Sequence, residues 1–133
     1  MKLIINTDGG SRGNPGPAAI GVVIKNGTGK VLFKQGKCIG NTTNNQAEYQ
    51  AVVWAIEKAK ELSGTELEFR LDSELVVKQL NCEYKVKDAG LAQQFLKIFN
   101  ARSKFKSVSF RHVRRELNEE ADAMVNEALD IGK

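Results

Sequence analysis

Residues 45–73, NQAEYQAVVWAIEKAKELSGTELEFRLDS, hold the pattern that decides the fold. Up to about Leu62 the apolar residues recur at helical spacing, and Ser63-Gly64 is typical of a helix end. Residues 66–71 then predict a short strand, and Asp72-Ser73 favour the start of a further helix. Because a helix between two strands is typical of a parallel crossover, this stretch predicts an α/β fold.

Upstream of this stretch, apolar and polar residues alternate with the period of two that strands require. Strands are predicted at residues 2–8, 18–26 and 30–39. A tight Gly/Pro loop, SRGNPGP, follows the first strand, and Asn26-Gly27 with Gly29 marks a hairpin turn after the second. We therefore expect three antiparallel strands before the first helix.

Downstream, the pattern predicts a brief helix through Leu80, a helix at about 91–102, a strand at 106–112 and a last helix at about 116–129. The element order is β-β-β-α-β-α-α-β-α. It implies right-handed parallel crossovers and a five-stranded mixed sheet, three strands antiparallel and the next two parallel, flanked by helices on both faces.

Composition restricts the class of protein. The 133 residues, 41% of them hydrophobic, predict a single domain over residues 1–133 with one real core. No apolar run is long enough to span a membrane, and the N-terminus has the pattern of a strand, so we expect a cytoplasmic protein without membrane contact.

The net charge of +4 is compatible with a polyanionic partner. Cys38 and Cys82 are expected to be free thiols, with a single bridge as the alternative.

Two aspartates lie at predicted strand ends. Asp8 ends the first strand before Gly9-Gly10, where an ordinary turn aspartate is the alternative interpretation. Asp72 follows the fourth strand, at the edge where α/β sheets bind ligands, and a helix N-cap is an equally weighted alternative.

Two further acids lie on predicted helices. Glu48 falls near the middle of an apolar stripe, where an unpaired carboxylate is costly; the alternative is a capping box with Asn45 as N-cap. Asp122 borders the stripe of the last helix, and a solvated helix acid is its alternative. The first stripe comprises Ala47, Ala51, Val52, Ala55, Ala59 and Leu62, and the second Leu117, Ala121, Met124, Val125 and Ala128.

Taken together, the four acids indicate a metal site. Carboxylate oxygens are hard ligands that suit Mg²⁺ or Mn²⁺. Four clustered carboxylates repel one another without cations, whereas two cations roughly 3.5–4 Å apart would let them act on a phosphodiester. The sequence offers no alternative catalytic motif: it has no Ser/His/Asp set, no CxxC pair and no phosphate-binding glycine loop.

Four ordered strings, TDGGSRGNPGPAAIG, NTTNNQAEYQAVVWAIE, LDSELVVKQL and HVRRELNEEADAMVNEALD, cover much of the chain. They resemble the type 1 ribonuclease H family, in its bacterial and archaeal-like form without a basic handle or hybrid-binding domain. The resemblance implies a metal-dependent endonuclease that hydrolyses the RNA strand of RNA–DNA hybrids and leaves 5′-phosphate and 3′-hydroxyl ends. It also implies that Asp8, Glu48, Asp72 and Asp122 are catalytic ligands of two Mg²⁺ ions, which Mn²⁺ could replace. We expect a monomer.

The same resemblance implies substrate contacts. Asn14 and Thr43 would grip a DNA phosphate. Asn44 and Asn45 would read the minor groove, where small amides can bond 2′-hydroxyls; helix capping is the alternative for one of them. Backbone of the loop formed by Gly9, Gly10, Ser11 and Gly13 would assist them.

The chain departs from the family pattern in three places. Glu74 stands where the family often has a substrate-binding glutamine, and NCEYKVKDAG is too short for a basic handle. The loop before Asp122 is also short, and the sole histidine, His112, closes the predicted fifth strand. Arg115, in that loop, is therefore our candidate for the catalytic role of the family's loop histidine, acting through charge; a surface pair with Glu119 is the alternative.

Two other functions fit the same fold. A junction resolvase or exonuclease is disfavoured by the intact TTNN and NPGP segments. A non-catalytic hybrid-binding module would tolerate the loss of a carboxylate, yet all four are present.

Overall fold

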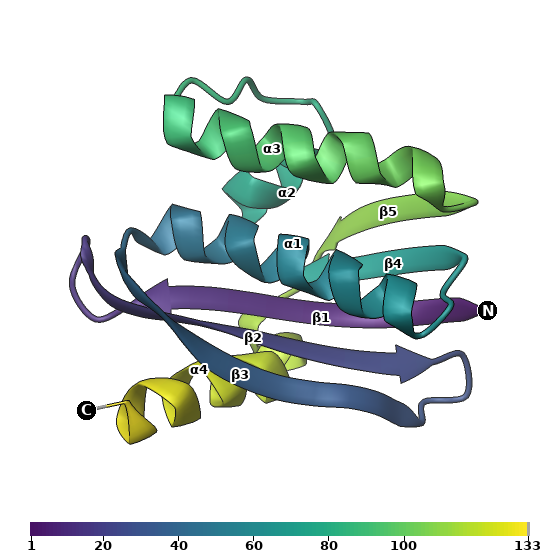
Figure 1. Cartoon of the computed structure of the whole chain (residues 1–133), viewed down its shortest axis with the longest axis horizontal. Coiled ribbons are helices and arrows are strands. Elements are labelled where there is room, and N and C mark those ends of the chain that lie inside the picture. Colours follow the sequence, from purple (N-terminus) through teal and green to yellow (C-terminus); the bar gives the residue numbers. More distant parts are fainter. Residues whose placement is uncertain (133) are drawn as a thin grey trace.

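The computed structural model describes residues 1–132, which fold around one mixed sheet (Figure 1). The first three strands pair antiparallel, and β4 pairs parallel with both β1 and β5. The predicted five-stranded mixed sheet is confirmed, with the spatial order β3-β2-β1-β4-β5. The strands are β1 (Lys2–Ser11), β2 (Gly16–Asn26), β3 (Val31–Thr42), β4 (Glu66–Leu71) and β5 (Ser107–His112).

Helices cover both faces of the sheet, as expected. Figure 1 shows α1 lying along one face beneath α3, while α4 crosses the opposite face over β2 and β3. No helix in the described part of the chain has the length and apolar character that a membrane span requires. The helices are α1 (Asn44–Glu61), α2 (Glu74–Leu80), α3 (Ala89–Ala101) and α4 (Glu119–Ile131), with 3₁₀ turns η1 (Arg102–Lys104) and η2 (Arg115–Asn118).

The main core lies between the sheet and α1. Small residues on α1, including Ala47, Ala51 and Ala55, are fully buried and let the helix approach β1 closely. Tyr49 is also fully buried, and its hydroxyl donates a 2.6 Å hydrogen bond to Gln79 Oε1 of α2. Burial raises the pKa of Tyr49 to about 12, so this bond persists as a neutral pair at any ordinary pH.

Several element bounds differ from the sequence prediction. β1 does not end at Asp8: it continues through Ser11, because the residues expected to form a loop stay paired with β2. α3 begins earlier than predicted, since the Asp88 side chain caps it by accepting from Leu91 N at 2.9 Å. α4 begins later, after the turn η2, so Leu117 is 62% exposed and was wrongly placed in the apolar stripe. Cys38 and Cys82 are free, exposed thiols, as expected.

Two glycines let α4 rest directly on the sheet. Gly21 and Gly36 are paired across β2 and β3. A Cβ at Gly21 would lie 2.4 Å from the Ala121 carbonyl oxygen, and one at Gly36 would lie 2.2 Å from that of Met124. No side chain could fit in either place, so the backbone of α4 itself makes this contact.

We predict that Gly21→Ala destabilises the protein by about 1–3 kcal/mol, because the added methyl group meets backbone that cannot rotate away. Gly27→Ala is the matched control, since a Cβ there has no atom within 4 Å. It should change the free energy of unfolding by less than about 0.5 kcal/mol. Urea denaturation of the three proteins measures both effects, and equal midpoints would show that α4 does not rest on Gly21.

Candidate active site

The site forms where two parallel strands part. β1 pairs with β4 only as far as Asn6 and Arg70, and β1 then continues along β2 to Ser11. β4 ends at Leu71, and Asp72 follows immediately. Asp8 lies on the extended part of β1, so the two aspartates face the gap left by the diverging strands.

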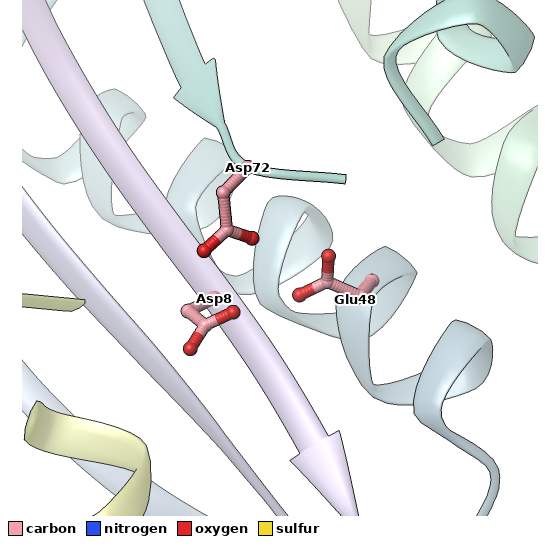
Figure 2. Close-up of side chains that lie close together, drawn as sticks. All are labelled: Asp8, Glu48 and Asp72. Atoms are coloured by element: carbon pink, nitrogen blue, oxygen red, sulfur yellow. The ribbon is translucent and has the colours of Figure 1, made fainter. Parts of the chain in front are cut away.

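Three carboxylates converge in this gap. Figure 2 shows Asp8 on β1, Glu48 on α1 and Asp72 after β4, with their carboxylates turned toward one another. One oxygen from each lies within 4.8 Å of the others. Asp8 is 8% exposed and Glu48 7%, so water screens their charges poorly.

Side chains take the place of a neighbouring strand along the free edge of β1. Gly9 N–H donates to Glu48 Oε1, and Ser11 N–H donates to Asn44 Oδ1 at 2.8 Å. The Thr7 carbonyl accepts from Asn118 Nδ2 at 2.9 Å. Backbone groups that β4 no longer pairs are thereby satisfied, and the same bonds fix Glu48 and Asn44 in the site.

The observed caps of α1 and α2 decide two alternatives that the sequence left open. Thr43, not Asn45, is the N-cap of α1, and its hydroxyl accepts from Gln46 N at 3.2 Å. The capping box, which was the alternative interpretation of Glu48, is wrong, since Glu48 accepts from Gly9 N–H instead. Ser73 caps α2 by accepting from Val76 N at 3.3 Å. Asp72 is therefore not needed as a cap, and its carboxylate can serve the cluster.

A cavity of about 420 Å³ contains the cluster together with most of the residues predicted from the sequence. Asp122 enters it from α4 and accepts a 3.3 Å hydrogen bond from Asn126 Nδ2. The predicted residues in its wall are Asp8, Gly9, Gly10, Ser11, Asn44, Asn45, Glu48, Asp72, Arg115 and Asp122.

Four predicted residues lie outside the cavity wall. Asn14 Oδ1 accepts from the backbone N–H of Asn44 at 3.0 Å, so Asn14 is bonded to a residue of the wall. Thr43 caps α1, and the Gly13 carbonyl accepts from the Ser11 hydroxyl. Glu74 is exposed and pairs with Lys78 at 3.0 Å.

The sequence reasoning missed Arg12, Ser73 and Asn126, which also line the cavity. Asn126 lies four residues after Asp122 on α4, a spacing that places both on one helix face and could have identified it. Arg12 pairs with Asp130 at 2.7 Å, a contact between distant parts of the chain that no local pattern reveals.

Arg115 begins the turn η2 and is not in an irregular loop as expected. It lines the cavity, and within residues 1–132 it forms no ion pair with Glu119. The surface-pair alternative is therefore wrong. His112 is the exposed last residue of β5, as expected, and does not line the cavity.

Burial and mutual repulsion hold protons on the cluster. Burial, the charges of Glu48 and Asp72, and hydrogen bonds with Glu48 and Asp122 all raise the pKa of Asp8. Burial also raises the pKa of Glu48, helped by the charge of Asp72 and opposed by the hydrogen bonds from Asp8 and Gly9. A hard divalent cation fits this donor set, because it would replace those protons and offset the repulsion.

Comparisons with known proteins identify relatives of this chain. A family model described as reverse transcriptase-like matches residues 6–128. Ribonuclease HI of Halobacterium salinarum is 45% identical over 92% of this chain and 62% of its own length. The crystal structure of RNase H1 from that organism matches with a TM-score of 0.96 at 42% identity, over 98% of this chain and 99% of the other. The crystal structure of LC11-RNase H1 in complex with an RNA/DNA hybrid matches with a TM-score of 0.93 at 44% identity, over 98% of each chain.

The mixed sheet with strand order β3-β2-β1-β4-β5 and helices on both faces is the ribonuclease-H-like fold. The chain belongs to the type 1 ribonuclease H family. It spans 62% of the length of the curated halobacterial relative and 36% of that of the curated mycobacterial relatives.

We predict that the metal-free protein loses stability as the pH rises from about 5 to about 8. Folding raises the pKa of the carboxyl groups of Asp8 and Glu48, so the folded chain binds their protons more tightly than the unfolded chain does. The stability that these protons contribute is lost as the pH rises from the unfolded pKa, about 4, through the folded pKa. Glu120, whose pKa is lowered chiefly by the hydrogen bond from Lys25, titrates below this window.

Thermal unfolding in chelator across this range measures the effect. Asp8→Asn should flatten the profile, and Mg²⁺ should raise the wild-type midpoint more at the alkaline end than at the acidic end. A wild-type midpoint that rises with pH, or an unchanged profile in Asp8→Asn, would contradict the proton-sharing cluster.

Proposed function

We propose that residues 1–133 form the catalytic domain of an endonuclease that hydrolyses the RNA strand of RNA–DNA hybrids, acts as a monomer, and leaves 5′-phosphate and 3′-hydroxyl ends. The observation that carries the proposal is the convergence of Asp8, Glu48 and Asp72 in a cavity that Asp122 also enters. The hybrid bound to LC11-RNase H1, a protein 44% identical to this chain, supports the substrate class.

The four carboxylates would hold two Mg²⁺ ions, with Mn²⁺ as a substitute. When bound, the ions supply the positive charge that stabilises the attacking and leaving oxygens of the phosphodiester. Asp8, Glu48 and Asp72 each bring a carboxylate oxygen within 4.8 Å of the others. In this proposal Glu48 and Asp72 flank Asp8, and Asp122 approaches from the α4 side.

The cavity wall offers groups that can recognise RNA. Asn44 Oδ1 is occupied by Ser11 N–H, which leaves the Asn44 amide nitrogen as a donor for a 2′-hydroxyl. In this proposal Asn45 and the backbone of Gly9 and Gly10 make further minor-groove contacts from the same wall. Asn14 and Thr43 lie beyond it, beside the start of α1, and would bind a phosphate of the DNA strand.

Arg115 would supply charge to the reaction. It lines the same cavity as the carboxylates. A guanidinium donates hydrogen bonds but does not serve as a general acid or base, so the part of Arg115 in the reaction would be electrostatic. Its guanidinium can neutralise charge that develops on the phosphate or draw the product phosphate away.

We predict that Asp72→Asn abolishes cleavage while the thermal midpoint of the metal-free protein stays the same or rises. The substitution removes one proposed ligand and also one of the charges that repel Asp8 and Glu48. Cleavage of hybrid, double-stranded RNA and double-stranded DNA, each with Mg²⁺, Mn²⁺ or chelator, tests the function. Near wild-type activity of Asp72→Asn would exclude the four-carboxylate site, and metal-dependent cleavage of DNA alone would exclude the proposed substrate.

We also predict that Arg115→Ala lowers turnover on the hybrid by roughly ten- to a thousandfold, the range that a positioned charge usually contributes. His112→Ala is the control, because His112 lies at the end of β5 outside the cavity and should affect turnover less. Both variants are compared on one hybrid at saturating Mg²⁺. If His112→Ala is the slower enzyme, His112 has the catalytic role that is proposed for Arg115.

A further inference from the structure

Asn118 occupies the N-cap position of α4 without capping the helix. Its side chain makes no cap hydrogen bond, and the residue is only 1% exposed. Instead, its Nδ2 donates to the Thr7 carbonyl at 2.9 Å, and its Oδ1 accepts from Asn6 Nδ2 at 2.9 Å. Burial of an amide is tolerable only when both of its ends are bonded, and here both are bonded to β1.

These bonds join the two segments that carry Asp8 and Asp122. Thr7 directly precedes Asp8 on β1, and Asn118 precedes Asp122 by about one helical turn. The Asn6 amide adds a 3.2 Å bond to the Leu117 carbonyl, so the chain is held just before α4 begins. The register of α4 along β1 is therefore set by a short, directional contact beside the site.

The glycine contact fixes α4 a second time at the same place. Gly21 is the residue paired with Asp8 across β1 and β2, and the Ala121 carbonyl rests on it. Ala121 is the immediate neighbour of Asp122. Asn118 and Gly21 thus hold the α4 backbone at two points within the turn that leads into Asp122.

The other polar ties of α4 are too weak to do this. The ion pairs Arg12–Asp130, Lys25–Glu120 and Lys34–Glu120 are at least partly exposed, and such pairs are usually worth less than about 1 kcal/mol. The exposed Cys38 thiol donates to the Ala128 carbonyl at 3.1 Å, but a thiol is a weak donor. Asp122 itself bonds to Asn126 of the same helix, which does not place the helix on the sheet. Within residues 1–132, the side-chain hydrogen bond that ties the start of α4 to β1 and is itself buried is the one that Asn118 donates to the Thr7 carbonyl.

We propose that Asn118 is a positioning residue: its carboxamide sets the register of α4 on β1 and so places Asp122 beside Asp8. This inference rests on the proposed function, in which Asp122 helps to hold the cations. Asn118 faces β1 and not the cavity, so it acts through Asp122 and touches no reacting atom.

The test compares Asn118→Asp with Asn81→Asp. The first keeps the shape of the side chain and its acceptor but turns the donor that faces the Thr7 carbonyl into a second acceptor. The second removes a bond of the same type at an exposed residue that ends α2, from Asn81 Nδ2 to the Phe110 carbonyl at 3.1 Å. The kcat and KM on a hybrid, and the Mg²⁺-induced rise in thermal midpoint, are measured where each variant is folded.

For Asn118→Asp we expect kcat to fall by roughly ten- to a hundredfold, as when a group that orients a metal ligand is lost, with little change in KM. The midpoint rise caused by Mg²⁺ should shrink. Asn81→Asp should keep the wild-type kcat and the wild-type response to Mg²⁺. A wild-type kcat and Mg²⁺ response in Asn118→Asp would overturn the proposal, and so would equal losses in both variants.

Two further variants keep the result interpretable. Asp122→Asn is assayed alongside: if it retains activity, the proposed role of Asp122 fails, whereas an inactive Asp122→Asn with a wild-type Asn118→Asp refutes only the positioning role. If Asn118→Asp does not fold, Asn6→Ala removes one of the two bonds to the carboxamide. A smaller loss of kcat and of Mg²⁺ stabilisation in Asn6→Ala supports the proposal, and wild-type values for both contradict it.

Discussion

Like charges repel, and three carboxylates whose oxygens lie within 4.8 Å of one another must be held in place by the rest of the molecule. Each comes from a different element: a strand that outruns its partner, the first turns of a helix packed on that strand, and the end of the neighbouring strand. The buried alanines of α1 and the Tyr49–Gln79 bond keep these elements close. The stability of the core thus maintains an arrangement that the metal-free site by itself opposes.

This opposition links folding to catalysis. Groups that share protons in the metal-free protein are poised to exchange them for divalent cations, so the same burial that costs stability gives the site its affinity for positive charge. Burial also keeps water from screening the cluster. The two glycines under α4 serve the same end from the opposite face, because they bring the helix that carries Asp122 against the sheet.

Much of the fold and site could be predicted from the sequence, because periodicity reports burial. Glu48 was recognised because it interrupts an apolar stripe, and it is indeed buried. The errors arose where one residue type serves two structures. Asp8-Gly9-Gly10 resembles a turn but continues the strand, since β2 pairs with it. Thr43 and Asn45 are both good caps, and only the path of the chain selects Thr43. Asn118 resembles an ordinary helix cap, and its bonds to β1 depend on contacts more than a hundred residues apart along the chain.

The free edge of β1 has a consequence for solubility. A strand edge with unpaired N–H and C=O groups is a template on which strands of other molecules can assemble, and it is a common origin of aggregation. Between Thr7 and Ser11 this edge is occupied by Asn118, Glu48 and Asn44, which take the backbone groups that an incoming strand would need. The residues that build the site therefore also close a sheet edge to intermolecular pairing. We expect substitutions at these positions to increase self-association even where the fold survives.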